Sequence, residues 1–262
     1  MSPVLWEGAT AEEWRRRWAL PELLIFDVIG STNDALDRPV AEGAAAGTVA
    51  LADHQTAGRG RMGRSWSAPP GRALLLSVLL RPAPSADPAI GALPLRIGLA
   101  AAGAIEHAAG TRVRIKWPND LVALDGSKLG GILCESRTPG VVVAGLGINV
   151  NQAPDELPAG ASSLRILAGG EVSRAGVAGA LLRALAPLFV APANALRDVE
   201  RAALAERDHL RGRPVTLDGR AAGIAEDVAP DGSLIIRGDA GPFVIHAGTV
   251  RLQPSHTSEA EP

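Results

Sequence analysis

Apolar and polar residues along the chain follow two periods that predict strands and helices in alternation. Continuous or alternating apolar runs are typical of strands, and six such runs occur before residue 150: 23–29, 48–52, 73–80, 113–116, 128–135 and 141–146. Ser31-Thr32-Asn33-Asp34 follows the first run and is a helix N-cap sequence. Helical periods are expected over 90–109, which is rich in alanine, and between 173 and 207. The pattern therefore predicts an α/β chain.

After residue 211 the pattern changes to short strands separated by turn sequences. Four apolar runs are predicted as strands: 215–217, 221–225, 233–236 and 243–245. Asp218-Gly219, Asp231-Gly232 and Gly241-Pro242 separate them, a spacing typical of hairpins in a small β-barrel or β-roll. We therefore expect a catalytic or binding domain over 1–210, a small β-domain over 211–255 and a disordered polar tail over 256–262.

Composition narrows the class of protein without deciding it. The formal net charge of the 262 residues is -2, which argues against a dedicated DNA-binding protein. Cys134 is the only cysteine, so neither a disulfide within the chain nor a zinc pattern is expected. The N-terminus has no apolar signal core, and Pro94 and Arg96 interrupt the longest apolar stretch. We expect a cytoplasmic protein with no membrane segment.

The run Gly58-Arg-Gly-Arg-Met-Gly-Arg-Ser-Trp66 has no helical or strand period and little to bury. Fixing one backbone residue costs roughly 1–2 kcal/mol, so ordering the run costs on the order of 9–18 kcal/mol. We expect an anionic ligand to offset this cost, bound by guanidinium groups and backbone N–H groups. The run also matches the dinucleotide fingerprint G-x-G-x-x-G, but the following Ser65 to Pro70 cannot open the helix which that motif requires. A solvated surface loop is the remaining alternative.

Three other segments place polar residues at strand ends. Lys116-Trp-Pro-Asn-Asp120 suits a phosphate and its magnesium ion, with the lysine on the phosphate and the carboxylate on the metal. Lys128-Leu-Gly-Gly-Ile-Leu133 begins an apolar strand with a lysine beside two glycines, and Asn149 ends another strand. The alternatives are ordinary turn residues for Asn119 and Asp120, and a snorkelling lysine for Lys128.

In this order and spacing, these residues resemble those of biotin protein ligases. The resemblance runs through Ser31-Thr32-Asn33, Gln55, Gly58 to Trp66, Lys116 to Leu121, Lys128 to Leu133 and Gly147-Ile148-Asn149, and covers about residues 23–253. It implies an α/β fold of the α+β type, with a mixed-sheet catalytic domain and a C-terminal SH3-like β-barrel. Many members begin with a helix-turn-helix domain; because the signature starts at residue 31, we expect a monofunctional ligase.

The resemblance also implies roles for individual residues. The biotin site would contain Ser31, Thr32, Asn33, Gln55, Arg59, Gly60, Arg61, Lys128 and Gly131. The nucleotide site would contain Arg59, Arg61, Arg64, Trp66, Lys116, Asn119, Asp120 and Asn149. Asp120 would hold Mg²⁺, and Lys128 and Arg61 would be the catalytic residues.

The implied reaction begins when the biotin carboxylate attacks the α-phosphorus of ATP, a step that needs positioning and cations more than a side-chain nucleophile. Biotinyl-5'-AMP then acylates a lysine of a biotin carboxyl carrier domain of acetyl-CoA carboxylase or a related enzyme. Two alternatives remain. One is a lipoate–protein ligase or octanoyltransferase, of which the transferase type needs a reactive cysteine or lysine that Cys134 could supply. The other is a biotin-sensing protein without catalysis. No DNA or membrane partner is expected.

Overall fold

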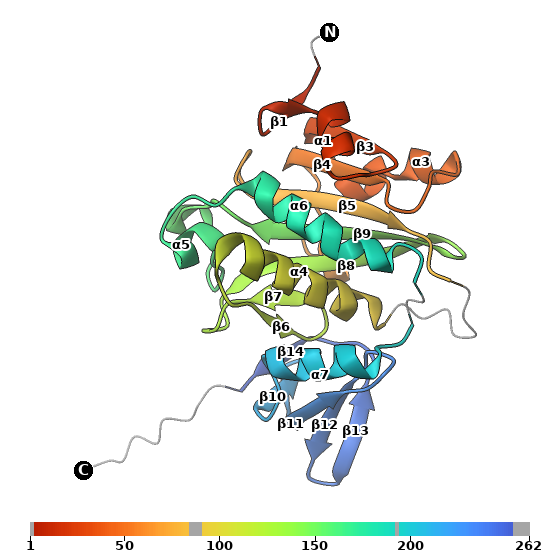
Figure 1. The fold of residues 1–262 in the computed structure, drawn as a ribbon. Helices are drawn as coiled ribbons and strands as arrows, with labels where there is room; N and C mark the ends of the chain where they lie inside the picture. The colour runs from red at the N-terminus through yellow and green to blue at the C-terminus, as the bar shows by residue number, and fades with distance from the viewer. Residues whose placement is uncertain (1–2, 84–90, 192–193, 254–262) are drawn as a thin grey trace.

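The computed structural model describes residues 3–83, 91–191 and 194–253, which form a mixed sheet, a second smaller sheet and the helices that cover them (Figure 1). The seven-stranded sheet has the order β3-β4-β5-β9-β8-β7-β6. Its strands are β3 (Leu23–Ile29), β4 (Val49–Gln55), β5 (Ala73–Leu80), β6 (Arg114–Lys116), β7 (Asp120–Val122), β8 (Lys128–Thr138) and β9 (Val141–Asn149). β3 and β4 are parallel, whereas each of the other neighbouring pairs is antiparallel. The predicted α/β fold with a mixed sheet is thus confirmed.

Helices and short segments surround this sheet. They are α1 (Ala11–Arg17), α2 (Thr32–Ala35), α3 (Asp37–Ala41), α4 (Leu93–Ala109), α5 (Leu164–Ala168), α6 (Arg174–Leu185) and α7 (Asp198–Arg207), with 3-10 turns η1 (Arg61–Gly63), η2 (Pro154–Glu156) and η3 (Ala186–Leu188). A short hairpin, β1 (Leu5–Trp6) and β2 (Ala9–Thr10), precedes α1. No helix in the described part of the chain is both long and apolar enough to span a membrane.

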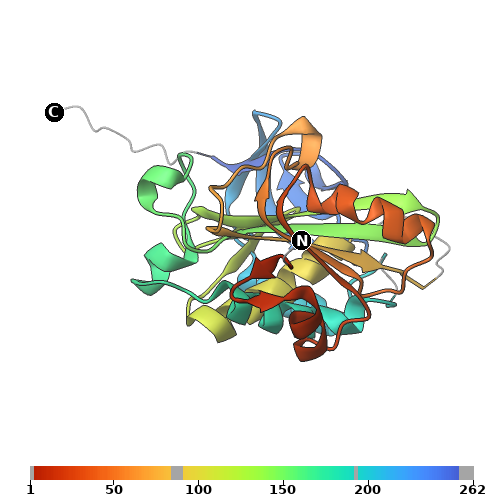
Figure 2. The same cartoon turned by 90° about the horizontal axis from the view of Figure 1, so that it is seen from above.

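The sheet is covered on both faces. Seen from above, α4 and α6 lie on one face, and α2, α3 and the segment around residue 60 lie on the other (Figure 2). The continuous apolar run of β5 is buried along its whole length because both faces are covered. On the α2 side, Leu36 packs with Ala50, Leu79 and Val143. The central strands therefore form a rigid floor for whatever lies on the α2 face.

The second sheet has five strands in the order β13-β12-β11-β10-β14. They are β10 (Pro214–Leu217), β11 (Arg220–Val228), β12 (Leu234–Gly238), β13 (Gly241–Ile245) and β14 (Val250–Leu252), all paired antiparallel. The pairings in the described residues give an order of five strands with β13 and β14 at its ends, and the expected SH3-like β-barrel stays a prediction. The predicted tail over 256–262 lies outside the described residues.

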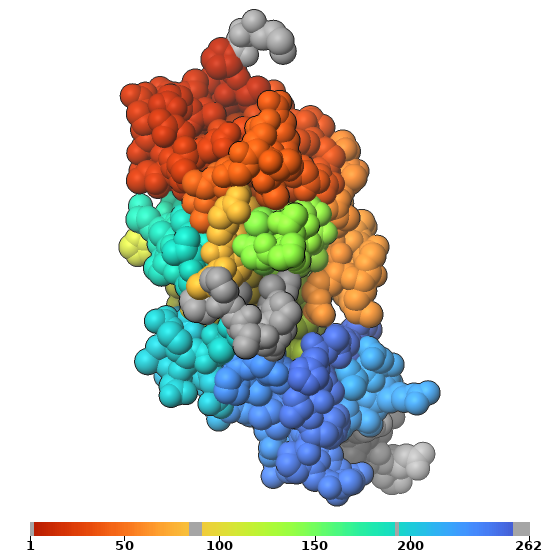
Figure 3. Space-filling model, turned by 90° about the vertical axis from the view of Figure 1, so that its right-hand side faces the viewer, coloured from red at the N-terminus to blue at the C-terminus, as the bar shows by residue number. Residues whose placement is uncertain are grey.

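Two contacts fix the second sheet to the first. The buried indole of Trp117 donates from Nε1 to the carbonyl of Gly232 at 2.9 Å, and the Trp117–Pro118 peptide bond is cis. The backbone N–H of His209 donates to the carbonyl of Ile115 at 2.9 Å. The small sheet is therefore attached at the strand end that carries the Lys116–Asp120 segment, and it forms the lower lobe of the molecule in Figure 3.

His209 at this junction predicts a pH dependence of stability. Burial, together with the charges of Arg213, Lys116 and Arg114, lowers the pKa of His209 to about 4. Because the folded pKa lies below the unfolded value near 6.5, this contribution is present above pH 6.5 and is lost as the pH falls towards 4. We expect the unfolding free energy to fall less between pH 8 and pH 5 in the variant His209→Met than in wild type.

Denaturant titrations of both proteins at the two pH values check this expectation. Burial raises the pKa of Asp208 to about 6, which acts in the opposite direction over the same window. Asp208 is present in both proteins, so their difference isolates His209. An equal loss of stability in wild type and His209→Met would contradict the assignment.

Candidate active site

A pocket lies on the α2 face of the large sheet, between the N-terminus of α2, the run Gly58–Trp66 and the small sheet. Its walls come from segments far apart in the sequence: 31–33, 55, 59–62, 64–66, 116–120, 128, 131–133, 145–147 and 248–251. The sequence-predicted site residues that line it are Ser31, Thr32, Asn33, Gln55, Arg59, Gly60, Arg61, Arg64, Trp66, Lys116, Asn119, Asp120, Lys128 and Gly131. The fold therefore brings almost the whole predicted set together.

One end of the pocket carries neutral polar groups that hydrogen-bond to one another. Gln55 Oε1 accepts from the Thr32 backbone N–H at 2.7 Å and from Thr32 Oγ1 at 2.9 Å. The hydroxyl of buried Ser77 lies 2.7 Å from Thr32 Oγ1 and 2.6 Å from Asn33 Oδ1. A Cβ on Gly145 would collide with Asn33 Oδ1, so the strand beneath must be glycine there. We call Thr32, Asn33, Gln55 and Ser77 the polar end of the pocket.

The run Gly58–Trp66 folds back on itself over the pocket. Arg59 and Ser65 form an antiparallel bridge, Gly60 N–H donates to the Arg64 carbonyl at 2.7 Å, and Trp66 N–H donates to the Gly58 carbonyl at 2.8 Å. At the tip, Met62 adopts a left-handed conformation with φ 56°. These backbone hydrogen bonds offset part of the free-energy cost of ordering the run. They could not be predicted from the sequence pattern. As expected, no helix follows the run, which excludes the dinucleotide fingerprint.

Trp66 separates the polar end from the charged end. A Cβ on Gly147 of β9 would lie 2.7 Å from Trp66 Nε1 and 2.8 Å from Cζ2, so the indole rests directly on a glycine backbone. The ammonium of Lys128 lies 5.8 Å from the centre of the indole ring, within cation–π range. Trp66 also packs against Ala68, Ala73 and Leu75. The ring therefore has a fixed place between β9 and Lys128.

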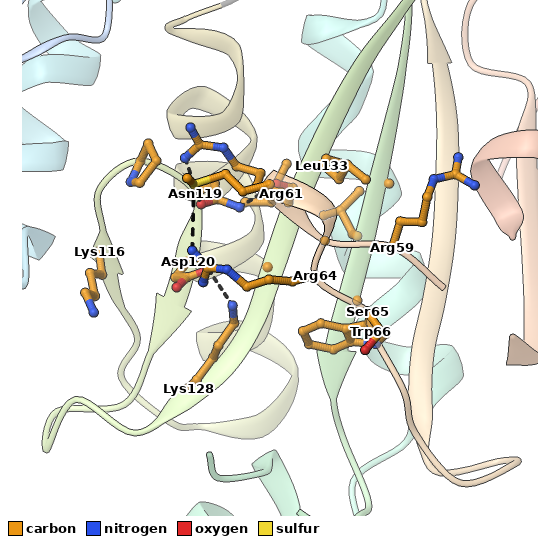
Figure 4. Close-up of a pocket in the computed structure, with 18 of the residues that line it drawn as sticks. Arg59, Arg61, Arg64, Ser65, Trp66, Lys116, Asn119, Asp120, Lys128 and Leu133 are labelled. Carbon is orange, nitrogen blue, oxygen red and sulfur yellow. Dashed lines mark hydrogen bonds and ion pairs between the residues drawn. The ribbon is translucent and has the colours of Figure 1, made fainter. Parts of the chain in front are cut away.

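Cations dominate the charged end of the pocket. Lys128 Nζ forms an ion pair with Asp120 Oδ1 at 2.6 Å, and Arg61 Nη1 donates to Asn119 Oδ1 at 3.4 Å (Figure 4). Burial lowers the pKa of Arg61 and of Lys116, and the neighbouring cations Lys128, Arg251 and Arg64 lower that of Lys116 further, whereas Asp120 opposes this. Positive charge thus exceeds negative charge here, an arrangement that a polyanion relieves.

Both lysines of the chain are in this pocket. The sequence contains 26 basic residues, of which only Lys116 and Lys128 are lysine. Everywhere else the chain uses arginine. An ammonium is a compact charge with three donors, whereas a guanidinium is a wide planar fork, so the two residues are not equivalent beside Trp66 and Asp120.

The small sheet also contributes to the pocket. Gly248 to Arg251 line it, and Arg64 Nη2 donates to Thr249 Oγ1 at 3.3 Å. The surface around residue 60 accordingly lies against the blue lobe in Figure 3. No site role could be assigned to these residues from the sequence, because they lie far along the chain from the other site motifs and carry a common strand pattern. The signal in the sequence that could have found them is the segment Gly248-Thr249-Val250-Arg251-Leu252-Gln253, near the end of the small β-domain.

Asn149 is the exception among the predicted residues, because the structure does not place it in the pocket. Its buried side chain donates from Nδ2 to the Ser162 carbonyl at 3.0 Å, and its Oδ1 accepts from Gln152 Nε2 at 2.8 Å. Both ends of the amide are therefore occupied inside the protein. A polar residue at a strand end is ambiguous in a sequence, since it can face a ligand or brace a neighbouring loop.

A magnesium ion would fit this site only together with ligands from a bound nucleotide. The described residues contain no group of three or more histidine, cysteine, aspartate or glutamate side chains arranged to hold a metal. Asp120 supplies one carboxylate at the charged end. Mg²⁺ is commonly held by one or two carboxylates together with substrate phosphates and water, so this donor set is compatible with it.

Cys134 does not fit the role of a nucleophile. Burial raises the pKa of its thiol to about 12, so the thiolate is scarce at neutral pH. It lies in β8 and is not among the residues lining the pocket. A mechanism that depends on a reactive cysteine is therefore not supported.

Residues 25–152 match the model of the biotin/lipoate A/B protein ligase family. The chain is also similar to the biotin–[acetyl-CoA-carboxylase] ligase of Mycobacterium tuberculosis, with 36% identity over 235 residues that cover 84% of this chain and 85% of that protein. This chain belongs to the biotin protein ligase family. It also matches the bifunctional ligase/repressor BirA of Bacillus subtilis at 40% identity over 166 residues, 59% of this chain but only half the length of that relative.

Among biotin protein ligases of known structure, the enzyme from Aquifex aeolicus in complex with biotin and ATP aligns with a TM-score of 0.75 and 26% sequence identity. The alignment covers 88% of this chain and 99% of that chain. Such coverage extends beyond the 25–152 match.

Proposed function

We propose that this protein activates biotin with ATP to form biotinyl-5'-AMP and transfers the biotinyl group to a lysine of a biotin carboxyl carrier domain. The single observation that carries the proposal is one continuous pocket with a neutral polar end, an indole in the middle and a cationic end. Membership in the biotin protein ligase family and similarity to the Mycobacterium tuberculosis acetyl-CoA-carboxylase ligase support the same reaction.

The proposed binding mode follows the polarity of the pocket. The ureido ring of biotin carries both N–H donors and a carbonyl acceptor, which the polar end matches with Thr32, Asn33 and Gln55. Ser31, Gly60 and Gly131 line the same cavity. The biotin carboxylate then lies towards Lys128, and the triphosphate lies among Arg61, Arg64 and Lys116. Trp66 is proposed to stack on the adenine base.

Chemistry in this arrangement needs no protein nucleophile. A carboxylate oxygen of biotin attacks the α-phosphorus of ATP, and the bond to the bridging oxygen breaks as pyrophosphate leaves. Lys128 and Arg61 stabilise the charge that develops on the α-phosphate, and Asp120 would hold the magnesium ion bound to the phosphates. The amine of the acceptor lysine then attacks the biotinyl carbonyl, loses a proton, and AMP leaves.

The small sheet is proposed to complete the nucleotide site. Arg251 lies close enough to Lys116 to lower the pKa of that residue, and Thr249 contacts Arg64. We propose a division into a catalytic domain over 1–210 and an SH3-like domain over 211–255 that covers ATP. Cytoplasmic location stays a prediction from the sequence.

The proposal is tested by incubating the protein with ATP, Mg²⁺, biotin and a purified biotin carboxyl carrier domain. We expect one biotinyl group on one lysine of the carrier domain, detected by intact mass and by streptavidin binding. A carrier domain whose acceptor lysine is replaced with arginine is the control. Labelling by lipoate under the same conditions, or binding of biotin without transfer, would overturn the proposal in favour of a lipoate ligase or a sensor.

Arg61→Ala is expected to release biotinyl-5'-AMP faster than wild type. The guanidinium is half-buried in the pocket wall, so its removal deletes charge-assisted hydrogen bonds worth about 1.5–3 kcal/mol, or roughly ten- to a hundredfold in dissociation rate. Stopped-flow dilution of the adenylate complex measures the rate. Arg38→Ala, which removes an exposed arginine on α3 paired with Glu42, is the control. An unchanged release rate in Arg61→Ala would place Arg61 outside the adenylate site.

A further inference from the structure

Glu135 of β8 connects the polar end of the pocket to the run Gly58–Trp66. One carboxylate oxygen, Oε2, lies 2.6 Å from Asn33 Nδ2, 3.3 Å from Arg59 Nη2 and 3.3 Å from Arg137 Nη2. Asn33 belongs to α2, Arg59 to the run, and Arg137 to the same strand as Glu135. A single atom therefore accepts hydrogen bonds from α2, from the run and from β8 itself.

This contact fixes the orientation of the Asn33 amide. An ionised carboxylate only accepts hydrogen bonds, so the Asn33 atom that faces it must be the amide nitrogen. Asn33 Oδ1 then faces Ser77 and lies over Gly145. Without Glu135, rotation of the amide by half a turn would place a donor where the pocket now presents an acceptor.

The hydrogens at the polar end can be counted. Gln55 accepts the Thr32 backbone N–H, so the atom facing Thr32 is Oε1, and the Thr32 hydroxyl donates to it as well. Ser77 has one hydroxyl hydrogen for two acceptors, Thr32 Oγ1 and Asn33 Oδ1. One of these oxygens is left to accept from a ligand N–H. The amide orientation that Glu135 imposes thus favours a ligand that donates.

Glu135 and Asp34 together bind the guanidinium of Arg59 at the beginning of the run. Arg59 binds Asp34 through two nitrogens, at 2.7 and 2.6 Å, and this carboxylate raises the pKa of the guanidinium. Figure 4 shows the Arg59 side chain extending away from Asp120 and Lys128. Arg59 therefore anchors the run by its side chain and also lines the pocket; its contact with a ligand stays a prediction.

We propose that Glu135 is a positioning residue that couples recognition of the ligand head group at Asn33 to the placement of the arginine-rich run through Arg59. This inference rests on the proposed function for the identity of the ligand. Glu135 itself is not among the residues that line the pocket and touches no reacting atom. Its effect is transmitted through Asn33 and Arg59, two of the three side chains that donate to its Oε2 atom.

The test compares Glu135→Gln with Asp37→Asn. Asp37 is an exposed carboxylate that pairs with Arg137 Nε at 3.0 Å and contacts neither Asn33 nor Arg59, so its variant removes the outer part of the same ion network only. Two readouts are taken: the rate of trypsin cleavage within the run in the protein without ligands, and KM for biotin against kcat in biotin-dependent pyrophosphate exchange.

For Glu135→Gln we expect cleavage after Arg59, Arg61 or Arg64 to be faster and KM for biotin to rise, each about tenfold or more, the scale of one charge-assisted hydrogen bond. We expect kcat to stay within about twofold, because no reacting atom is touched. Asp37→Asn should match wild type in both readouts. A fall of kcat by about tenfold with KM for biotin unchanged would overturn the proposed coupling between Asn33 and Arg59. Wild-type values in both readouts would also overturn it.

The two proposals fail in distinguishable ways. If wild type shows no biotin-dependent exchange, the proposed function fails, while the cleavage rates of the ligand-free variants still decide whether Glu135 holds the run. If wild type is active and Glu135→Gln is indistinguishable from it, only the coupling fails. Should Glu135→Gln not fold, Glu135→Asp is the second variant. It keeps the negative charge, but its shorter side chain moves the carboxylate oxygen away from Asn33 and Arg59, so we expect faster cleavage and a higher KM for biotin in this variant as well.

Discussion

Lys128→Ala is expected to lower the rate of biotin-dependent adenylation by about 10²–10³-fold, the cost of removing one preorganised group that stabilises transition-state charge. Lys128 lies where the proposed biotin carboxylate and α-phosphate meet, between Trp66 and Asp120. Its loss removes the cation nearest the reacting atoms and also leaves the Asp120 carboxylate without its ion-pair partner. Pre-steady-state quench measurements of adenylate formation at saturating biotin and ATP give the rate directly.

Arginine should not restore this activity, since its wide fork does not fit the place of an ammonium beside the indole. Lys116→Arg is the matched control for Lys128→Arg. Lys116 is the only other lysine of the chain and lines the same pocket, and Figure 4 shows it farther from Trp66 than Lys128 is. We expect Lys116→Arg to change KM for ATP more than the rate of the chemical step. Adenylation by Lys128→Ala at a rate close to that of wild type would exclude Lys128 from the reaction.

Gly147→Ala is the second variant with a large expected effect, although it removes no functional group. The added Cβ would lie 2.7 and 2.8 Å from two atoms of the Trp66 ring, and β9 is held between β5 and β8, so the indole must move. A misplacement of about 1 Å in a positioned site can cost about a hundredfold in rate. We therefore expect adenylate formation to fall by roughly that factor.

Gly103→Ala is the matched control for this substitution. Gly103 lies in α4, its added Cβ meets nothing within 4 Å, and the change from glycine to alanine in a helix is expected to stabilise the fold by about 0.5–1 kcal/mol. Activity should be unchanged. Thermal unfolding of Gly147→Ala, measured beside the assay, shows whether the protein remains folded. Wild-type adenylation in a folded Gly147→Ala would mean that the position of Trp66 does not matter.

Local patterns were sufficient to predict much of the fold. The apolar runs 23–29 and 73–80 coincide with β3 and β5. β5 is buried along its whole length, and a strand covered on both faces needs no alternation, whereas β3 is an edge strand and only partly buried. Ser31 is the N-cap of α2 as expected. The short β7 was missed, since three residues after a turn carry too little pattern to be distinguished from a loop. The β1-β2-α1 segment was also missed; it is fixed by packing among Trp6, Trp14 and Trp18, a long-range property.

Some residues of the candidate site could also be predicted from the sequence, and others could not. Residues within short motifs, such as Gly58–Trp66 and Lys116–Asp120, could be predicted because glycine, arginine and paired polar groups at close spacing have few structural uses. Ser77, Glu135 and Arg251 could not be predicted. Each contacts the site from a strand whose sequence looks ordinary, and only the pairing of strands distant in sequence brings them there. Asn149 is the converse case: its motif position did not reveal that its amide is hydrogen-bonded within the protein, and its role towards the nucleotide stays a prediction.

The most direct test of the account is exchange of radiolabelled pyrophosphate into ATP, with biotin, lipoate or neither acid present. We expect exchange that depends on biotin and Mg²⁺ and is absent with lipoate. The reason is that the polar end is proposed to bind the ureido group of biotin, and the charged end the triphosphate of ATP. Exchange with lipoate would contradict the assignment of the polar end. No exchange with either acid, in a protein that binds biotin, would contradict the central claim that this pocket activates a carboxylate.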